Sequence, residues 1–249
     1  MIKNIIFDLD GTITNSYEGI VNAVKFSLDK VNFKYDESKL ISFIGPPLKD
    51  SYTELGFSEI ESKERIEDFR DYYFKKGMKE MELYDGIVET IHKFYDEGYK
   101  IYLATSKVES SARKILSDNN LLKYFSYTAG ATMDQSRVEK EDVIAYLIDK
   151  TDINPEESIM VGDRHHDIEG ARLNNIKAIA AGYGFGNAEE YKNAVFVADN
   201  PTDVYEFVIN QNDRWFEWLI ILKIRLWNFQ KKMKKLEVLL KRGEDLILL

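Results

Sequence analysis

The chain has 249 residues, of which 44% are hydrophobic and 31% are charged, and its formal net charge is −9. This balance is ordinary for a soluble globular protein, and the negative net charge argues against nucleic acid as a partner. The chain has no cysteine, which excludes disulfides, thiolate nucleophiles and thiolate metal sites. Acidic residues interrupt the first apolar run, so we expect no secretory signal and a cytoplasmic protein.

The first predicted element is a short strand at residues 5–7, whose continuous apolar run suits a strand buried on both faces of a parallel sheet. Asp8 and Asp10 follow it directly, and Gly11 and Thr12 begin a turn. Ligand sites in open α/β sheets lie just outside the carboxyl ends of strands. Two carboxylates placed there repel each other unless a cation lies beside them, and oxygen ligands of this kind suit Mg²⁺. The plainer alternative is a strand followed by an Asp-Gly turn.

The next stretch, residues 16–81, shows no strand pattern and carries apolar residues at helical spacing. Within it we predict helices at 17–31, 39–43, 48–55 and 59–76. The sequence Gly45-Pro46-Pro47 separates two of these helices. It is either a rigid turn between helices or a loop that faces a binding site. We interpret the whole stretch as a small helical insertion.

An α/β pattern resumes after residue 81, where apolar strand-like runs alternate with helical stretches. The predicted strands are 100–106, 124–131, 158–161, 178–182 and 194–198, and the predicted helices include 87–95, 107–116, 138–148 and 201–210. Strands that alternate with helices favour a parallel sheet. We therefore expect an α/β fold with a Rossmann-like parallel sheet.

Polar residues recur where these later elements meet. Thr105 and Ser106 end the second strand, where a hydroxyl and helix N–H groups can bind a phosphate; the same residues are also ordinary helix caps. Lys140 lies near the start of a helix, where a cation opposes the helix dipole unless an anion is close. Lys107 and Lys150 are alternatives for the same role.

A second acidic pair, Asp163 and Asp167, follows the predicted strand 158–161 and brackets a turn into a helix. His165 and His166 lie between these two acids. Adjacent residues rarely aim at one ion, so we interpret the histidines as a solvated turn pair. Arg164 receives no role beyond a possible salt bridge in the core.

These features follow one another in a recognisable order: Asp8-Leu9-Asp10-Gly11-Thr12, a hydroxyl after the second strand, a lysine, and Gly162-Asp163 with a second aspartate. The order resembles the four motifs of the haloacid dehalogenase superfamily, over about residues 1–210. The Asp-x-Asp pair and the helical insertion look like its phosphoglycolate-phosphatase-like branch. The resemblance implies a catalytic core at 1–15 and 82–211 and a helical cap at 16–81. Asn15 departs from the pattern, since relatives often carry aspartate there.

The resemblance also implies a chemistry: a cytoplasmic, Mg²⁺-dependent phosphatase that hydrolyses a small phosphorylated metabolite, such as phosphoglycolate, a nucleotide or a sugar phosphate. Asp8 would form an aspartyl-phosphate, Asp10 would act as general acid and base, and Lys140 and Thr105 would stabilise charge on the phosphoryl group. The implied metal ligands are Asp8, Asp10, Asp163 and Asp167. The residues assigned to substrate binding are Gly11, Thr12, Ser106, Gly45 and Pro46. The alternatives are a phosphomutase of the same superfamily and a non-catalytic adaptor that acts through the C-terminal helix.

The last segment, residues 212–249, differs from the rest in charge, with a net of +4 against −13 elsewhere. Apolar residues recur every three or four positions from Trp215, which predicts a packed or coiled-coil helix to about residue 242. Lys223 and Arg225 interrupt the apolar stretch, which is too short to span a bilayer. A basic amphipathic helix can pair with another chain or lie on an anionic membrane. We therefore predict an extension that serves self-association or peripheral membrane contact.

Overall fold

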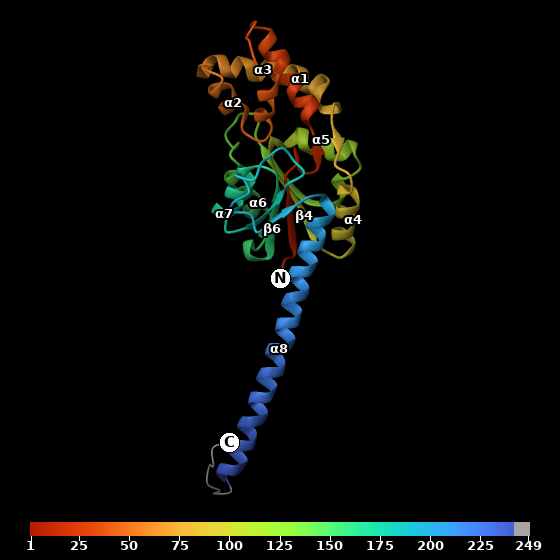
Figure 1. Cartoon of the computed structure of the whole chain (residues 1–249), viewed down its shortest axis with the longest axis vertical. Coiled ribbons are helices and arrows are strands. Elements are labelled where there is room, and N and C mark those ends of the chain that lie inside the picture. Colours follow the sequence, from red (N-terminus) through yellow and green to blue (C-terminus); the bar gives the residue numbers. More distant parts are fainter. Residues whose placement is uncertain (242–249) are drawn as a thin grey trace. The chain divides into compact units, whose positions relative to one another are not determined.

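The computed structural model describes residues 1–241, without some of the side chains beyond residue 215. Its centre is a six-stranded parallel sheet with the strand order β5-β4-β1-β6-β7-β8 (Figure 1). The strands are β1 (Asn4–Phe7), β4 (Lys100–Val108), β5 (Phe125–Ala131), β6 (Ser158–Gly162), β7 (Lys177–Ala181) and β8 (Phe196–Ala198). The chain runs from β1 outward to β5 and returns past β1 to β6. The strand order therefore reverses at β1, where open α/β sheets bind ligands. This confirms the predicted fold class.

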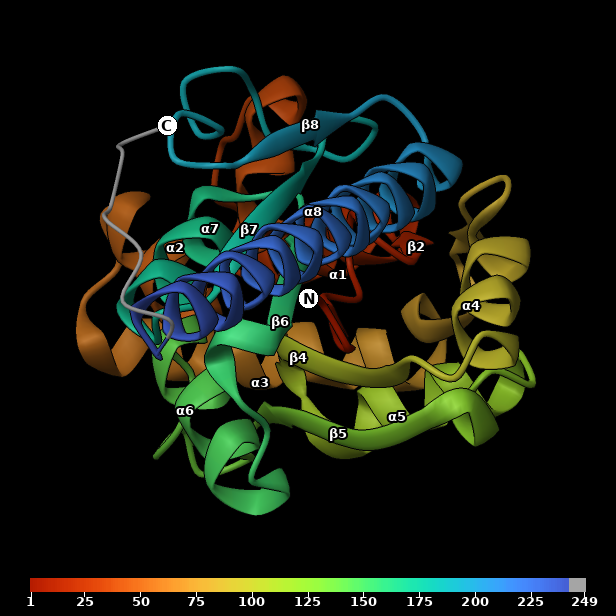
Figure 2. The ribbon, with the colours of Figure 1, turned by 90° about the horizontal axis from the view of Figure 1, so that it is seen from below.

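Helices cover both faces of the sheet (Figure 2). They are α4 (Ile87–Asp96), α5 (Glu109–Asp118), α6 (Lys140–Thr151) and α7 (His165–Leu173). Successive residues of β1 point to opposite faces. Ile6 packs in one cluster with Val143 of α6 and Ile168 of α7, whereas the ring of Phe7 lies 6.3 Å from that of Phe94 on α4. Both faces of β1 are thus buried, as its unbroken apolar sequence requires.

The stretch between β1 and β4 forms helices with a hydrophobic core of their own. The helices are α1 (Tyr17–Asp29), α2 (Leu48–Glu54) and α3 (Glu59–Lys75), with shorter helical turns at η1 (Glu37–Phe43) and η2 (Gly77–Lys79). Ser58 begins α3 in a capping box with Glu61, which fixes where this helix starts. The strands β2 (Thr14–Asn15) and β3 (Glu82–Leu83) pair antiparallel at the two ends of the insertion. The chain therefore enters and leaves the insertion at one place. From here on we call this helical insertion the cap.

The C-terminal helix α8 (Pro201–Lys241) is continuous, whereas the sequence pattern suggested a helix at 201–210 and a second one from 215. Residues 211–214 contain neither glycine nor proline, so nothing in the local sequence stops the helix between the two predicted parts. The chain divides into two compact units, one comprising Ile2–Phe207 and the other Met1 and the chain from Val208 onward. Within the described residues, no helix has a stretch long and apolar enough to cross a bilayer. The part of the predicted extension beyond residue 241 lies outside the described residues.

Candidate active site

Three aspartates meet at the carboxyl ends of two neighbouring strands. Asp8 follows β1 and Asp163 follows β6, and these strands pair in register, with Phe7 opposite Val161. Asp167 lies one turn further on, at the start of α7. All three side chains are buried. A carboxylate oxygen of each lies within 4.8 Å of one from each of the others. The sheet topology therefore gathers two motifs that lie far apart in the sequence.

Lys140, the first residue of α6, lies among these acids. Its Nζ atom is 2.9 Å from Asp8 Oδ1 and 2.6 Å from Asp167 Oδ1, and it donates to the carbonyl of Ala104 at 3.1 Å. The carboxylates of Asp8 and Asp167 are the anions that a lysine at a helix start needs nearby. Lys150, one of its two rivals, is instead exposed and pairs with Asp149.

The single positive charge of Lys140 does not offset the negative charges of three carboxylates. Burial raises the pKa of Asp8 to about 6 against the pull of Lys140, and repulsion from Asp167 adds to the rise. Burial likewise raises the pKa of Asp163 well above its usual value, helped by repulsion from Asp167 and Asp8. Since ionising these groups costs free energy, a further cation at this point would stabilise their charged forms.

The oxygen atoms of the cluster fit a magnesium ion. Asp163 Oδ2 accepts a hydrogen bond from the Phe185 N–H at 2.8 Å, but its Oδ1 is buried and has no hydrogen-bond partner in the described part of the chain. A buried, unpaired carboxylate oxygen is unfavourable unless a cation binds it. Carboxylate oxygens are the protein ligands that Mg²⁺ prefers. Asp8 and Asp163 would hold such an ion, with Asp167 beside it.

Gly11 allows Asp163 to come close to the first motif. Its φ of +83° favours glycine, and a Cβ atom there would lie 2.1 Å from Asp163 Oδ2. The adjacent Thr12 is fully buried, and its carbonyl accepts a hydrogen bond from the Tyr183 hydroxyl at 3.1 Å. Gly11 therefore lets the backbone after β1 pack directly against Asp163, and the hydrogen bond from Tyr183 holds the adjacent Thr12. Gly11 and Thr12 lie outside the described lining of the pocket, so their contact with substrate stays a prediction.

Asp10 has a different partner from the other acids. Its Oδ2 lies 2.7 Å from Nζ of Lys107, and its carboxylate lies outside the three-aspartate cluster. The pairing of β4 with β5 is irregular between Thr105 and Val108, which carries Lys107 past the regular end of the strand. Thr105 Oγ1 accepts a hydrogen bond from the Lys107 N–H at 3.2 Å. The two lysines therefore contact different acids. Lys140 contacts Asp8 and Asp167, and Lys107 contacts Asp10.

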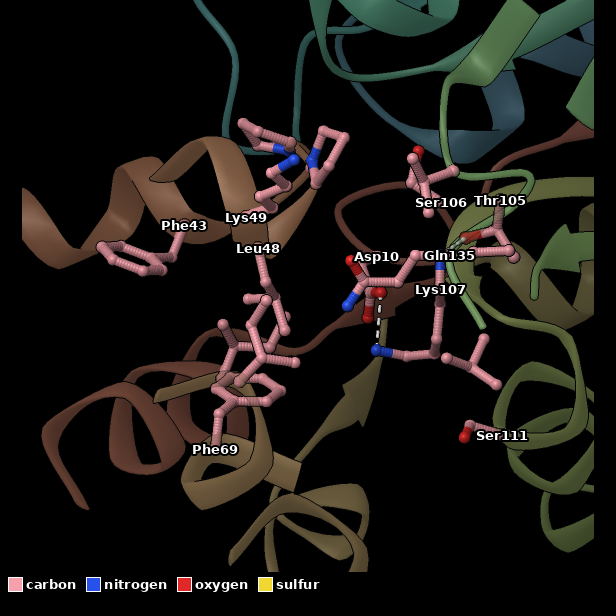
Figure 3. A pocket seen from close by; sticks show the side chains of 18 of the residues that line it. Asp10, Phe43, Leu48, Lys49, Phe69, Thr105, Ser106, Lys107, Ser111 and Gln135 are labelled. Atoms are coloured by element: carbon pink, nitrogen blue, oxygen red, sulfur yellow. Dashed lines mark hydrogen bonds and ion pairs between the residues drawn. The ribbon is translucent and has the colours of Figure 1, made fainter. Parts of the chain in front are cut away.

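A cavity of about 320 Å³ lies above this site, between the sheet and the cap (Figure 3). The sheet side contributes Asp8, Asp10, Thr105, Ser106, Lys107 and Val108, and the cap side includes Phe43, Gly45, Pro46, Leu48, Ile66, Phe69, Arg70, Tyr73 and Phe74. Ser106, Gly45 and Pro46 thus line the pocket, where the resemblance predicts contact with substrate. The sheet side of the cavity is charged and polar, whereas the cap side combines an apolar and aromatic surface with the charged residues Lys49, Asp50 and Arg70.

Arg164 holds the cap loop in place over the site. Its guanidinium donates hydrogen bonds to the carbonyl of Ile44 in the cap and, at 2.9 Å, to Glu190 in the core. Gly45 has a φ of +107°, and a Cβ atom there would lie 2.7 Å from Cγ of Arg164. The sequence offered only a possible salt bridge for Arg164, and its contact with a loop 120 residues away has no local signal.

The two histidines of the fourth motif differ in their surroundings. The side chain of His165 is half exposed, as a solvated turn residue would be. Burial and the neighbouring His165 lower the pKa of His166 to about 4, so this second ring stays neutral at physiological pH. Within the described residues, the cluster that could hold a metal ion consists of aspartates alone. Neither histidine is therefore needed for the acidic site.

Comparison with known proteins gives matches along most of the chain. The family model described as haloacid dehalogenase-like hydrolase matches residues 5–181. A 5'-nucleotidase from Pseudomonas aeruginosa is 36% identical over 191 residues, which cover 76% of this chain and 86% of that protein. The tyrosine-protein kinase PtkA from Mycobacterium tuberculosis is also 36% identical, over 74% of this chain and 64% of its own length. The crystal structure of a predicted phosphatase from Clostridium acetobutylicum superimposes with a TM-score of 0.82 and 38% identity, covering 84% of this chain and 99% of that one.

Proposed function

Because the chain belongs to the haloacid dehalogenase-like hydrolase family and is a phosphatase of that family, we propose that it hydrolyses a small phosphomonoester in a Mg²⁺-dependent reaction through an aspartyl-phosphate. The observation that carries this proposal is the buried cluster of Asp8, Asp163 and Asp167 around Lys140, at the charged end of a pocket. One oxygen of each acid lies within 4.8 Å of the others, and Lys140 contacts Asp8 and Asp167. The proposed catalytic residues are Asp8, Asp10, Thr105 and Lys140.

The reaction proceeds in two displacements at phosphorus. Asp8 attacks the phosphoryl group and forms an aspartyl-phosphate, while the bond from phosphorus to the leaving oxygen breaks. Asp10 gives its proton to that oxygen. It then takes a proton from the water that attacks the aspartyl-phosphate, which releases inorganic phosphate and restores Asp8.

The surrounding groups stabilise charge on the transferring oxygens. Lys140 offsets the negative charge at Asp8, and the Thr105 hydroxyl can donate to a phosphoryl oxygen at the end of β4. Mg²⁺, held by Asp8 and Asp163 with Asp167 beside it, would supply further positive charge. Asp8, Asp163 and Lys140 are buried, so these interactions are stronger than they would be in water.

The cap side of the cavity favours a substrate with a bulky organic part. Phe43, Leu48, Phe69 and Tyr73 give this wall an apolar and aromatic character. Phosphoglycolate or pyrophosphate would leave most of the wall in contact with water, and burying apolar surface on binding contributes about 25 cal/mol per Å². We therefore expect a nucleoside monophosphate or a sugar phosphate of similar size. The similarity to a 5'-nucleotidase supports this choice.

A substrate panel tests the proposed function. We would measure phosphate release from nucleoside monophosphates, sugar phosphates, phosphoglycolate and pyrophosphate, with Mg²⁺ and with EDTA. We expect release that requires Mg²⁺, with kcat/KM at least about tenfold higher for a substrate that fills the apolar wall, since 1.4 kcal/mol of binding is a factor of ten. Higher kcat/KM for phosphoglycolate would contradict the substrate class. Transfer of phosphate between positions of one sugar, without release, would favour the phosphomutase.

We further propose that the chain is organised as a catalytic core at 1–15 and 82–211, a cap at 16–81 and an extension at 212–249 that serves self-association. Apolar side chains on the described part of α8 are exposed, among them Leu222, Leu226 and Phe229. They follow the three-four spacing of a helix that packs on another helix.

Replacing these three residues by asparagine would test the role of the extension. We expect the variant to sediment as a smaller species than the wild type while its phosphatase rate stays unchanged. Binding of the wild type, but not the variant, to vesicles of anionic lipid would assign the helix to a membrane surface instead. Identical sedimentation and no vesicle binding would exclude both roles.

A further inference from the structure

Lys107 is a second buried cation at the site, and it contacts both the core and the cap. Its Nζ lies 2.7 Å from Asp10 Oδ2 in the core and 4.5 Å from the centre of the Tyr73 ring in the cap. Burial alone would lower the pKa of Lys107, but attraction to Asp10 and to the Tyr73 hydroxyl outweighs it and raises the pKa above its ordinary value. The ammonium therefore stays charged and links the two parts of the protein.

Tyr73 has a fixed position within the cap. It lies on α3, is 4% exposed, and stacks on Phe69 with ring centres 5.4 Å apart and an interplanar angle of 11°. Its ring also meets that of Phe74 edge-on at 6.4 Å. Because cap packing determines where Tyr73 lies, the contact with Lys107 exists only while the cap covers the core.

The Asp10 carboxylate is held on one side only. Oδ2 pairs with Lys107, whereas Oδ1 is buried and has no hydrogen-bond partner within the described residues. A carboxyl group that transfers a proton needs one oxygen free to face its reaction partner and must be aligned with it. The ion pair provides this arrangement, since it fixes the carboxylate through the oxygen that does not transfer the proton.

We propose that Lys107 is a positioning residue for Asp10, and that its contact with Tyr73 makes the alignment of Asp10 depend on closure of the cap. This inference rests on the proposed function, in which Asp10 protonates the leaving oxygen. The proton moves from Asp10 Oδ1 to the oxygen released from phosphorus, and Lys107 keeps its own proton throughout. An open cap would leave Lys107 without its aromatic partner and Asp10 less well aligned.

The choice of leaving group separates this role from a general structural one. An alkoxide is a poor leaving group and needs a proton from Asp10, whereas p-nitrophenolate leaves as a stable anion. Loss of Asp10 alignment should therefore slow hydrolysis of an alkyl phosphate much more than hydrolysis of p-nitrophenyl phosphate. Damage to the fold, or to Mg²⁺ binding, should slow both esters alike.

The experiment compares kcat on both esters for three variants of the full chain. Lys107→Met keeps the length of the side chain and removes its charge, and Tyr73→Leu removes the aromatic ring that Lys107 contacts. Lys114→Met is the matched control, because it makes the same change at an exposed lysine that pairs with Asp118 outside the pocket. We expect Lys107→Met to lower kcat on the best alkyl phosphate by about 10²-fold, a typical contribution of general acid–base catalysis. The loss on p-nitrophenyl phosphate should stay below about tenfold.

The two remaining variants complete the pattern. We expect Tyr73→Leu to change the ratio of the two rates in the same direction by about threefold or more, because a cation–π contact is worth about 0.5–2 kcal/mol. Lys114→Met should leave both rates unchanged. In an Asp10→Asn background, Lys107→Met should have no further effect on the alkyl ester, because two residues that act as one unit are not additive.

Equal losses on the two esters, or a full additional loss in the Asp10→Asn background, would overturn the inference while leaving the phosphatase intact. If thermal unfolding shows that Lys107→Met does not fold, the rate ratio of Tyr73→Leu decides instead. A wild type that hydrolyses neither ester would refute the proposed function itself, and this inference would fall with it.

Discussion

Asp8→Asn should abolish phosphate release. The amide cannot form the aspartyl-phosphate, so both displacements at phosphorus are lost, and we expect kcat to fall by at least about 10⁴-fold, as for other essential nucleophiles. Lys140, Asp163 and Asp167 all remain in place, so the loss would report the chemistry of one group. Phosphate release from the best panel substrate, measured at saturating Mg²⁺, is the test.

The same substitution should not unfold the protein. The pKa of Asp8 rises from its ordinary value of 3.8 to about 6, mainly through burial. A carboxyl group with a raised pKa in the folded state contributes less stability as the pH rises from about 4 through 6, so at pH 7 its charge destabilises the metal-free fold. Asparagine removes that charge. We therefore expect the metal-free variant to unfold at the same temperature as the wild type or above it.

A matched control uses Asp96→Asn, at the exposed end of α4. It makes the same chemical change away from the site and should keep full activity and an unchanged unfolding temperature. If Asp8→Asn retained more than about a tenth of the wild-type rate, which is about 1.4 kcal/mol of barrier, Asp8 would not be the nucleophile. A lower unfolding temperature in EDTA would instead mean that the charge of Asp8 stabilises the acidic cluster.

Much of the site could be predicted because its residues lie at the ends of strands. Residues 5–7 form a fully apolar run that suits a strand buried on both faces, and the acids that follow then lie at its carboxyl end. In a parallel sheet all carboxyl ends share one edge. Phe7 stands opposite Leu103 of β4 as well as Val161 of β6. Polar residues that end separate strands therefore meet without any knowledge of side-chain direction.

The partner of Asp10 could not be predicted, whereas the resemblance already assigned Lys140 to the negative charge at Asp8. The sequence offered Lys107, Lys140 and Lys150 for one role, since each follows or precedes a helix near polar residues. An irregular end of β4 brings Lys107 to Asp10, and the position of the cap brings Tyr73 to Lys107. No periodic pattern in the sequence indicates either the strand irregularity or the position of the cap. Helix spacing says which residues a cap buries, but not where the cap lies.

The continuity of α8 shows a different limit. The change in charge near residue 212 is real, but a charge boundary need not be a structural boundary. A helix ends where a residue cannot continue it or where a cap satisfies its last carbonyls. Residues 211–214, Gln-Asn-Asp-Arg, provide neither a glycine nor a proline. The chain therefore crosses from the acidic part to the basic part within one helix.

Lys140→Met should have the second large effect, and on two properties at once. The lysine side chain is 2% exposed, and its partners Asp8 and Asp167 are 4% and 1% exposed. Removing one partner of a buried ion pair costs about 3–5 kcal/mol, because the remaining charges stay buried and unpaired. For a chain of this size that lowers the unfolding temperature by roughly 6–20 °C. Loss of a cation beside the phosphoryl group should also reduce kcat by about 10²–10³-fold.

A second substitution separates these two effects. Asp167→Asn, added to Lys140→Met, removes one of the unpaired charges and leaves Asp8 and Asp163 to hold the metal. We expect the double variant to unfold at a higher temperature than Lys140→Met alone, since the repulsion among the acids decreases. Its kcat should stay low, because nothing has replaced the ammonium beside the phosphoryl oxygens. Recovery of activity together with stability would mean that Lys140 serves only to neutralise the buried acids, and that catalysis depends on Asp8, Asp10 and the metal without it.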